Sequence, residues 1–459
     1  MSNFQECKNI KEIVQNISYD VCFKISFYSI LVYFLIPLLS MFTNIFIKGS
    51  STMYLYVGLF LFGFIGLLNG GIYFFKKYYE GKINSRVLVP IIIILIFFIW
   101  SFISSLLSSN KLFSFIGTWY RHDGYISYVF YLGFFIHGFI VSHDKTYLKT
   151  LLNILLISST IMCFLILINN KLTDIFVVGI NDFSYNPYTG FAYNTNHFAY
   201  YLSLTIVASI GAFLNCTGIK KVFYFFCYVV ELVVLIENRT FGSFFAIFIT
   251  IILLFIYSLL VKKNIIYTLL ILISILLSSL VFKNVRDDFN KFYYELFKIS
   301  TNFSNLSVPF IDDENVNNNS NLIICSGNSR LDLWLKGIEL IKNKPIFGYG
   351  IENLEKPYFD IVMCDRTDRP HNIFIQLGAN IGIMGIVLYV SFLGIIFINL
   401  LKKIKYIDPI IMCFAFMSIG YIVSSMFGNS MFYTTPYYMV SLGVIMSVYF
   451  FRRDEVNDR

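Results

Sequence analysis

The chain has 459 residues, of which 57% are hydrophobic, 19% aromatic and only 14% charged. Soluble domains contain about 25% charged residues, so this composition excludes a soluble globular protein and indicates a polytopic membrane protein. The formal net charge of +8 becomes informative only when its position relative to the membrane is known.

The first segment, residues 1–23, is too polar to cross a membrane. Its apolar side chains recur at helical spacing, at Ile10, Ile13, Val14, Ile17 and Val21. Such a stripe is typical of an amphipathic helix that lies on the membrane surface, and the segment does not resemble a cleaved signal peptide. We expect residues 1–23 to form a cytoplasmic interfacial segment.

Twelve apolar segments follow. A membrane-spanning helix needs about 20 mostly apolar residues, and the segments that approach this length are 24–46, 53–75, 87–107, 124–142, 148–168, 197–214, 222–236, 241–261, 265–282, 372–401, 408–426 and 436–451. They predict an all-α polytopic membrane protein, with nine spanning helices in residues 24–282 and three in residues 372–451. Residues 283–371 are expected to form one large loop that contains short helices, and residues 452–459 a tail.

Basic residues predict the orientation, because Lys and Arg accumulate on the cytoplasmic side of a membrane. With the N-terminus inside, every segment assigned to the cytoplasm carries at least two of them, as in 76–86, 402–405 and 452–459. The short connections assigned to the outside carry few, namely Lys48, Lys111, Arg121, Lys171 and Arg239. The sequence therefore predicts that both termini are cytoplasmic and that the loop 283–371 lies outside.

Three arginines and a histidine lie on the predicted outer face, at Arg121, Arg239, Arg330 and His371. Cationic side chains at a membrane surface are costly and usually have a partner. Any one of them alone can anchor the protein to lipid headgroups, but the four together favour a site for an anionic ligand.

Arg330 lies where a short helix of the outer loop is expected to begin. Ser329 and Asp332 form an N-cap signature, and the apolar periodicity that follows ends at Pro345. Free backbone N–H groups in the first turn of a helix attract anions, and a guanidinium chelates phosphate with its planar fork. The alternative is a solvated arginine on a surface helix.

His371 precedes the tenth apolar segment. Ile375, Gly378, Gly382 and Gly385 follow it at alternating spacings of four and three residues, which places them on one face of a helix. Small residues let a neighbouring helix approach closely. We therefore expect His371 to cap a tightly packed, inward-facing seam.

Four motifs resemble, in the same order, those of the O-antigen ligase and O-antigen polymerase superfamily of integral-membrane glycosyltransferases. HNIFIQLGANIGIMG, which starts at His371, resembles its histidine–glycine motif, and GFAYNTNHFAYYL resembles its G-x-x-x-N-x-N-x-x-A segment. ENRTFGSFFAI and SGNSRLDLWLKGIELIKNKPIFGYGIENL occupy the places of its two arginine motifs. The resemblance covers roughly residues 190–390 and departs from the family pattern at Asn238, where the family has Ser.

This resemblance implies transfer of a glycan from an undecaprenyl-diphosphate carrier to an acceptor sugar hydroxyl, on the outer side of the bacterial cytoplasmic membrane. It implies that His371 is the general base, because a histidine with a pKa near neutrality suits proton abstraction. Arg239 and Arg330, with Arg121 as a weaker third, would bind the donor diphosphate and stabilise its growing charge.

Other residues are expected to support this chemistry. Asn196 and Asn372 would orient groups rather than react. The predicted outer face has no carboxylate cluster or H-x-x-x-H pair that suggests a metal, and no phosphate-binding loop occurs, so we expect a metal-independent enzyme without a cofactor that uses an already activated donor. Cys325 and Cys364 share the outer loop and either form a disulfide or remain free thiols.

The expected partners are the lipid-linked glycan donor, a glycan, lipid or protein acceptor, and membrane lipid, with no nucleic acid. A polymerase, which extends another lipid-linked repeat, is slightly favoured over a ligase, which transfers to a different lipid or protein. The alternative from another class is a flippase or transporter of lipid-linked oligosaccharides. A flippase should place charged residues deep within several helices, whereas Glu231 is the main such residue here.

Overall fold

The computed structural model describes the chain except for several segments. The described ranges are 10–43, 50–82, 88–118, 121–172, 187–192, 194–283, 285–287, 290, 330–362, 368–429 and 431–450. Within these ranges the regular structure is helical and no strand occurs.

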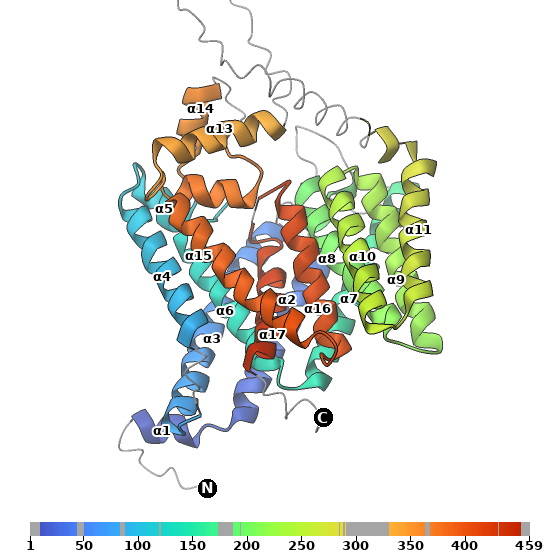
Figure 1. Ribbon diagram of the computed structural model, residues 1–459, viewed down its shortest axis with the longest axis horizontal. Helices are drawn as coiled ribbons and strands as arrows, with labels where there is room; N and C mark the ends of the chain where they lie inside the picture. The colour runs from blue at the N-terminus through green and yellow to red at the C-terminus, as the bar shows by residue number, and fades with distance from the viewer. Residues whose placement is uncertain are drawn as a thin grey trace, which may run out of the picture.

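The described helices form one bundle with a short helical layer across one end (Figure 1). The bundle consists of α2 (Tyr19–Thr43), α3 (Ser50–Tyr79), α4 (Leu88–Leu106), α6 (Tyr125–Val141), α7 (Lys145–Leu172), α8 (Thr195–Leu214), α9 (Ile219–Asn238), α10 (Phe241–Val261), α11 (Ile265–Val281), α15 (Ile373–Lys403), α16 (Pro409–Ser425) and α17 (Thr435–Phe450). The short helices are α1 (Ile10–Asn16), α5 (Lys111–Ile116), η2 (Pro187–Ala192), α13 (Arg330–Asn343) and α14 (Glu355–Val362).

Each of the twelve apolar segments predicted from the sequence overlaps one helix of this bundle. Seven helical stretches are long and apolar enough to cross a membrane, and they are Tyr19–Met41, Thr52–Tyr79, Val89–Leu106, Lys145–Ile168, Thr195–Leu214, Phe241–Val261 and Ile373–Lys403. Three further apolar helices are shorter, namely Tyr125–Val141, Ile265–Val281 and Pro409–Ser425. The chain is therefore a polytopic membrane protein, and the number of twelve crossings stays a prediction.

The surface of the bundle is as apolar as a lipid environment requires. α8 is buried along nearly its whole length, so it forms the centre of the bundle. α4, in contrast, exposes large apolar side chains such as Ile92, Leu95 and Ile99. Contiguous exposed apolar surface of this kind marks contact with lipid.

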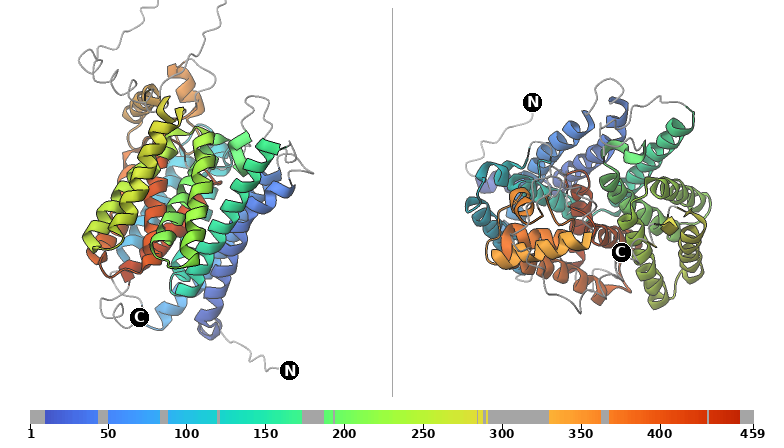
Figure 2. Two further views of the ribbon diagram at one scale, coloured as in Figure 1. Left: turned by 90° about the vertical axis from the view of Figure 1, so that its right-hand side faces the viewer. Right: turned by 90° about the horizontal axis from the view of Figure 1, so that it is seen from above.

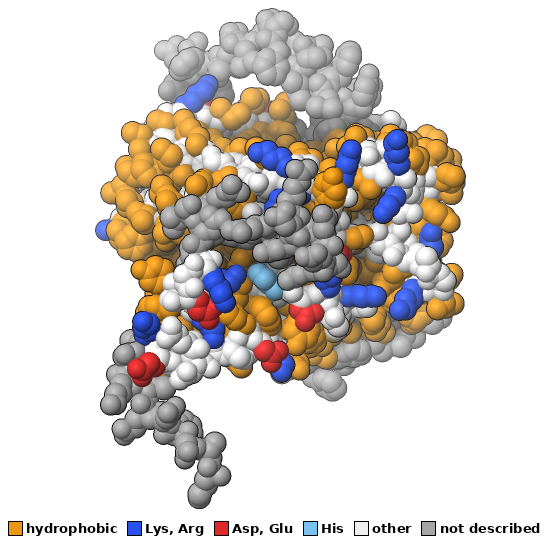
Figure 3. All heavy atoms as spheres, turned by 60° about the horizontal axis from the view of Figure 1, so that its bottom comes forward, with side chains coloured by type: hydrophobic (Ala, Val, Ile, Leu, Met, Phe, Trp, Pro, Cys, Tyr) orange, Lys and Arg blue, Asp and Glu red, His pale blue; other side chains and the backbone are white. Residues whose placement is uncertain are grey.

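The two ends of the bundle differ in charge and in structure. α1 and the end of α17 lie at one end, whereas α13 and α14 lie at the other (Figure 1). Lys and Arg side chains gather on the end that carries α1 (Figure 3). α1 ends at Asn16, where Lys76 donates hydrogen bonds to the carbonyl groups of Gln15 (2.9 Å) and Ile17 (2.5 Å). The apolar stripe expected over residues 1–23 is thus divided between α1 and α2.

α15 is not one continuous helix, because its backbone breaks at Ile381 and Gly382. Gly382 has a φ of +77°, a conformation that residues with a side chain rarely adopt. A Cβ atom at this position would collide with the backbone of Ile346. The N-terminal part of α15 therefore bends away from the longer C-terminal part, and Gly382 is required at the bend.

The break leaves carbonyl groups of α15 without their helical partners, and other segments satisfy them. The backbone N–H groups of Tyr349 and Gly350 donate to the carbonyls of Ala379 (2.9 Å) and Asn380 (2.8 Å). Trp100 of α4 donates through Nε1 to the carbonyl of Ile381 at 2.9 Å. The P-I-F-G-Y-G stretch at 345–350 thus completes the hydrogen bonding of a broken membrane helix, as the lipid environment demands.

The glycine seam expected below His371 is corrected by this break, which interrupts the periodic face at Gly382. Gly378 and Gly382 approach residues 341–346 rather than a second spanning helix. A Cβ atom on Gly378 would lie 2.6 Å from Ile341 of α13, and one on Gly337 of α13 would lie 2.5 Å from Ile375. Two reciprocal glycine–isoleucine contacts therefore hold α13 against the N-terminal part of α15.

We predict that Gly382→Ala destabilises the protein severely. The new Cβ would add the cost of a left-handed backbone, about 1–3 kcal/mol, to a collision with the Ile346 carbonyl. Gly394→Ala is the matched control in the same helix, because no atom lies within 4 Å of a Cβ built there. Thermal unfolding in detergent should show a large fall for the first variant and little change for the second. Equal melting temperatures would contradict the described break.

Candidate functional site

The candidate site lies at the end of the bundle that α13 crosses (Figure 2), around the residues where α8, α13 and α15 begin. The first turn of a helix leaves backbone N–H groups without intrahelical partners, and these groups attract anions. Helix N-termini gathered at one end make that end electropositive before any side chain is counted.

α15 begins where Asn372 caps it. The side-chain oxygen of Asn372 accepts hydrogen bonds from the N–H groups of Phe374 (3.0 Å) and Ile375 (3.3 Å). His371, the residue before the cap, has a φ of +51°, which is uncommon for a residue with a side chain. The cap and the left-handed turn together fix the direction in which the imidazole leaves the helix end.

His371 contacts the loop between α16 and α17. Asn429 Nδ2 lies 3.2 Å from Nδ1 of the imidazole, and Asn429 is buried. The ring of Tyr433, in the same loop, stacks on His197 of α8 with centroids 5.5 Å apart. The loop therefore connects His371 to the first turn of α8.

Arg330 is the first residue of α13, and its charge has the largest effect of any neighbouring charge on the pKa of His371. The guanidinium also forms a hydrogen bond with the hydroxyl group of Tyr200 on α8. Trp334, one turn further along α13, packs against Phe427 with ring centroids 5.9 Å apart. α13 thus brings Arg330 into the site. Ser329, the predicted cap of α13, lies outside the described residues.

Four polar atoms of this cluster are buried without a hydrogen-bond partner, namely Nη1 of Arg330, Nε1 of Trp334, Nδ1 of His197 and Oδ1 of Asn429. Buried polar groups in proteins are nearly always hydrogen-bonded. These three nitrogen atoms and one oxygen atom are therefore the groups that a bound polar ligand would satisfy.

The surroundings of His371 keep its imidazole neutral at physiological pH. Burial, followed by the positive charge of Arg330, lowers the pKa of His371 to about 4, although the carboxylate of Asp368 acts in the opposite direction. The pKa near neutrality expected from the sequence is thus corrected. The reason is that burial and nearby cations both disfavour the protonated ring.

A buried ion-pair network supports the turn before α15. Arg369 is 3% exposed, and its Nη2 lies 2.9 Å from Oε1 of Glu352 while its Nε lies 3.1 Å from Oδ2 of Asp368. Asp368 also pairs with Arg121, and the Thr118 hydroxyl donates to Oε2 of Glu352 at 3.2 Å. Three segments that are far apart in the sequence are therefore joined beside the histidine.

The charges in this network stabilise one another. Burial alone would raise the pKa of Asp368, but the charges of Arg369 and Arg121 hold this pKa below its usual value. Burial alone would lower the pKa of Arg369, but Glu352 and Asp368 raise this pKa above its usual value. Asp368 and Arg369 therefore remain ionised at neutral pH.

Of the three arginines predicted to bind an anion, Arg330 has the strongest electrostatic effect on His371. Arg121 and Arg239 have other surroundings. Arg121 forms an ion pair with Asp368. Arg239 ends α9 in a left-handed conformation, is exposed, and lines a separate small pocket with Thr240, Phe244 and other residues. Arg239 therefore has an exposed side chain and lies in a pocket separate from His371 and Arg330.

Two asparagines tie the start of α8 in place. Asn194 caps α8, because its side-chain oxygen accepts from the N–H groups of Asn196 (2.9 Å) and His197 (3.4 Å). Asn196 therefore lies in the first helical turn and is partly exposed. Asn238, at the end of α9, donates to the carbonyl of Thr195 at 3.1 Å. Asn238 is thus a structural link between α9 and α8.

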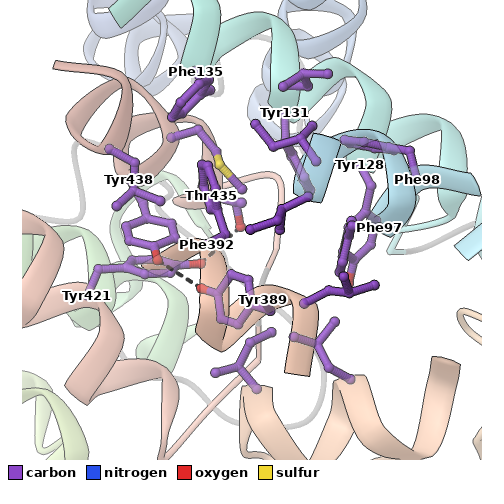
Figure 4. Close-up of a pocket in the computed structure, with 18 residues that line it drawn as sticks. Phe97, Phe98, Tyr128, Tyr131, Phe135, Tyr389, Phe392, Tyr421, Thr435 and Tyr438 are labelled. Atoms are coloured by element: carbon purple, nitrogen blue, oxygen red, sulfur yellow. Dashed lines mark hydrogen bonds between the residues drawn. The ribbon is translucent and has the colours of Figure 1, made fainter. Parts of the chain in front are cut away.

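An apolar chamber lies beside the first turns of α15 (Figure 4). Its cavity volume is about 90 Å³, and it is lined by Ile93, Ile94, Phe97, Phe98, Tyr128, Tyr131, Leu132, Phe135, Ile373, Leu377, Leu388, Tyr389, Phe392, Tyr421, Thr435, Tyr438, Met439 and Leu442. Four of its hydroxyl groups form two pairs, Tyr389 with Tyr438 at 2.8 Å and Tyr421 with Thr435 at 2.9 Å. The chamber therefore presents an apolar wall that begins two residues after His371.

Residues 225–390 match the model of a protein family described as O-antigen ligase. This match supports a relationship to the O-antigen ligase and O-antigen polymerase superfamily. No curated protein matches the chain. Members of the family are glycosyltransferase-like enzymes that act on lipid-linked glycans and acceptors. The match therefore supports an enzyme of that general kind in a bacterial membrane.

The family segment contains only part of the described site. Arg239, Arg330 and His371 lie within it, whereas His197 and Asn429 lie outside it. The sequence analysis did not assign a role to either of the last two residues. In the sequence, Asn429 lies in a short G-N-S stretch between two apolar segments. This pattern predicts a loop at a helix end, but it does not predict a catalytic or binding role.

Metal binding is not apparent in the part of the chain that the structure describes. Within it, no group of three or more His, Cys, Asp or Glu side chains is placed to hold a metal ion. Cys325 and Cys364 lie outside the described residues, so their pairing stays a prediction.

We predict that Glu352→Gln lowers the stability of the protein by about 3 kcal/mol, because the buried Arg369 loses one of its two carboxylate partners. Glu339→Gln on the exposed face of α13 is the control and should change little. Thermal unfolding of both purified variants in the same detergent gives the comparison. A melting temperature for Glu352→Gln equal to that of the control would argue against the network as a structural element.

Proposed function

We propose that this enzyme transfers a glycan from an undecaprenyl-diphosphate carrier to a hydroxyl group of an acceptor sugar on the outer side of the bacterial cytoplasmic membrane. The observation that supports this most strongly is that a neutral, partly buried His371 lies within the electrostatic influence of the cation Arg330, both inside the family segment. A base and a cation side by side are what the reaction requires, since one group accepts a proton while another stabilises an anionic leaving group.

Arg330 is the proposed principal ligand of the donor diphosphate. It stands at the start of a 14-residue helix, and one of its guanidinium nitrogen atoms is buried without a partner. Arg239 is the second proposed ligand, because its side chain is exposed and free to turn towards a bound anion. Arg121 has a weaker claim than the other two, since it already pairs with Asp368. Two arginines supply the positive charge, so we propose a mechanism that needs neither a metal nor a cofactor.

His371 is the proposed general base. Its imidazole would take the proton of the acceptor hydroxyl as the oxygen attacks the anomeric carbon, and the diphosphate would leave with the electrons of the broken C–O bond. Asn372 would contribute by capping the first turn of α15. Asn196, which lies in the first turn of α8, would orient groups of the substrate. The apolar chamber beside Ile373 suits the hydrocarbon part of the lipid carrier.

The proposed topology has both termini in the cytoplasm and twelve crossings. Residues 1–23 would form the interfacial segment, 24–282 the first nine spans, 283–371 the outer loop, 372–451 the last three spans and 452–459 the tail. α13 and α14, which belong to the outer loop, lie at the end of the bundle opposite α1. The basic side chains near α1 support a cytoplasmic assignment for that end (Figure 3).

A polymerase remains slightly favoured over a ligase within this proposal. A flippase is less well supported, because Glu231, the main acidic residue deep in the bundle, is buried. It accepts hydrogen bonds from the hydroxyl groups of Ser209 (3.2 Å) and Thr160 (3.5 Å). A side chain that is enclosed by hydroxyl groups does not line an open route for a glycan.

We predict that His371→Ala and His371→Gln insert and fold but transfer little glycan from a purified polyprenyl-diphosphate donor. Loss of a general base typically costs about 10²–10⁴ in rate, and Gln can form a hydrogen bond but cannot usefully accept the proton. The assay should run with and without a chelator. Full activity of the Gln variant would leave His371 an orienting residue only, and loss of wild-type transfer upon chelation would contradict the metal-free mechanism.

The pH profile tests the same base in the intact enzyme. We predict that kcat/KM stays flat through neutral pH and falls only as the pH approaches about 4, because the base must be deprotonated and the pKa of His371 in the free enzyme is lowered to about 4. Steady-state transfer rates between pH 4 and 8 provide the measurement. An acid limb near pH 6.5, the usual value for histidine, would contradict the buried, cation-flanked environment.

A further inference from the structure

Asn429 is held rigidly in position to face the imidazole of His371. The hydroxyl group of Tyr200 donates to the carbonyl of Phe427 at 3.3 Å. The ring of Tyr200 also packs so tightly on Gly428 that any side chain there would collide with it. Asn429 follows directly and is 8% exposed. Tyr200 of the central helix α8 therefore fixes the position of the Asn429 amide.

The amide group of Asn429 can present either of its ends to the imidazole. In the structure Nδ2 faces Nδ1 of His371 at 3.2 Å, while Oδ1 is buried without a partner. A half-turn of the amide places Oδ1 against Nδ1 instead, and Asn side chains adopt the end that the hydrogen-bond network favours. The choice of end decides which ring nitrogen carries the proton.

The two arrangements have different chemical consequences. When Nδ2 donates to Nδ1, the neutral ring carries its proton on Nε2 and cannot accept another there. When Oδ1 accepts from Nδ1–H, Nε2 keeps its lone pair. After the ring has taken a proton it carries N–H groups on both nitrogens, and only Oδ1 then suits the Nδ1 side.

We propose that Asn429 is a positioning residue that holds the Nδ1–H tautomer of His371 through Oδ1 and leaves Nε2 free to accept the proton of the acceptor hydroxyl. This inference rests on the proposed function. In the transfer step the hydroxyl proton moves to Nε2, the oxygen bonds to the anomeric carbon, and the diphosphate departs with the electron pair of the broken bond. The Nδ1–H group stays hydrogen-bonded to Oδ1 throughout, in the manner of a base oriented by a third group.

Asn429 comes close to His371 only in the folded protein, because the two residues are far apart in the sequence. It lies in the loop between α16 and α17, beyond the family segment that ends at residue 390. The other charged groups that act on His371 are Arg330 from α13, Asp368 and Arg369 from the turn before α15, and Arg121 from the turn before α6. Because these groups are unchanged in the variants below, a shifted titration of His371 reports on residue 429.

Asn429→Leu and Asn429→Asp give the sharpest test. Leu removes the hydrogen bond at similar volume, so kcat should fall by at least about 10-fold while the KM values for donor and acceptor stay the same. Asp accepts from Nδ1–H more strongly and adds a negative charge, so activity should be retained and the acid limb should move up by about one pH unit or more. Asn215→Asp, at the opposite end of α8, controls for the added charge and should leave the acid limb of the pH profile unchanged.

A double-variant comparison separates positioning from structure. In a His371→Ala background, Asn429→Leu should cause no further loss of activity, because residues that act as one unit are not additive. A further loss of the same size as in the wild type would overturn the proposal. So would an Asn429→Asp variant whose acid limb does not move, or an Asn429→Leu variant with wild-type kcat.

A readout that needs no transfer keeps the test independent of the proposed function. Diethyl pyrocarbonate modifies only the neutral imidazole, so the pH dependence of His371 labelling, followed by mass spectrometry, reports its titration directly. The midpoint should rise in Asn429→Asp and stay unchanged in Asn215→Asp. If the wild type transfers no glycan but the midpoint rises, the proposed function fails while the contact with Oδ1 stands. An unmoved midpoint overturns the Asn429 proposal whether or not transfer occurs.

Discussion

A helix inside a membrane cannot leave its carbonyl groups without hydrogen-bond donors, because the hydrocarbon core supplies none. α15 breaks at Gly382, and the freed carbonyls of Ala379, Asn380 and Ile381 accept hydrogen bonds from the 345–350 stretch and from α4. Because these donors replace the missing helical partners, the N-terminal part of α15 can bend. The bent part packs against α13 and ends at the cap beside the histidine, so the position of the candidate base depends on how the break is satisfied.

The electrostatics of the site follow from the same arrangement. α13 lies across the N-terminal part of α15 and places the charge of Arg330 where it acts on His371, and burial together with this charge keeps the imidazole neutral. In the proposed function a bound diphosphate adds negative charge beside the ring. Negative charge raises the pKa of a histidine, so His371 would become a stronger base when the donor is present. The Arg369–Glu352 pair holds the preceding turn and adds no free charge of its own.

Much of this architecture could be predicted from the sequence, because apolar length and Lys/Arg bias determine where membrane helices lie. Arg330 and His371 could be linked through four ordered motifs. The break at Gly382 could not be predicted, since its spacing from Gly378 and Gly385 also fits an unbroken helical face. Nor could the role of Asn429, because a loop asparagine has no periodicity and its partner is 58 residues away in the chain.

The most direct measurement is a cryo-electron microscopy structure of the protein with an undecaprenyl-diphosphate-linked glycan bound to an inactive His371→Gln variant. The account predicts that the diphosphate contacts the guanidinium of Arg330, that the anomeric carbon faces residue 371, and that the lipid begins in the apolar chamber beside Ile373. Density for the diphosphate at the Arg121–Asp368 pair instead, with Arg330 remaining in contact only with Tyr200, would contradict it.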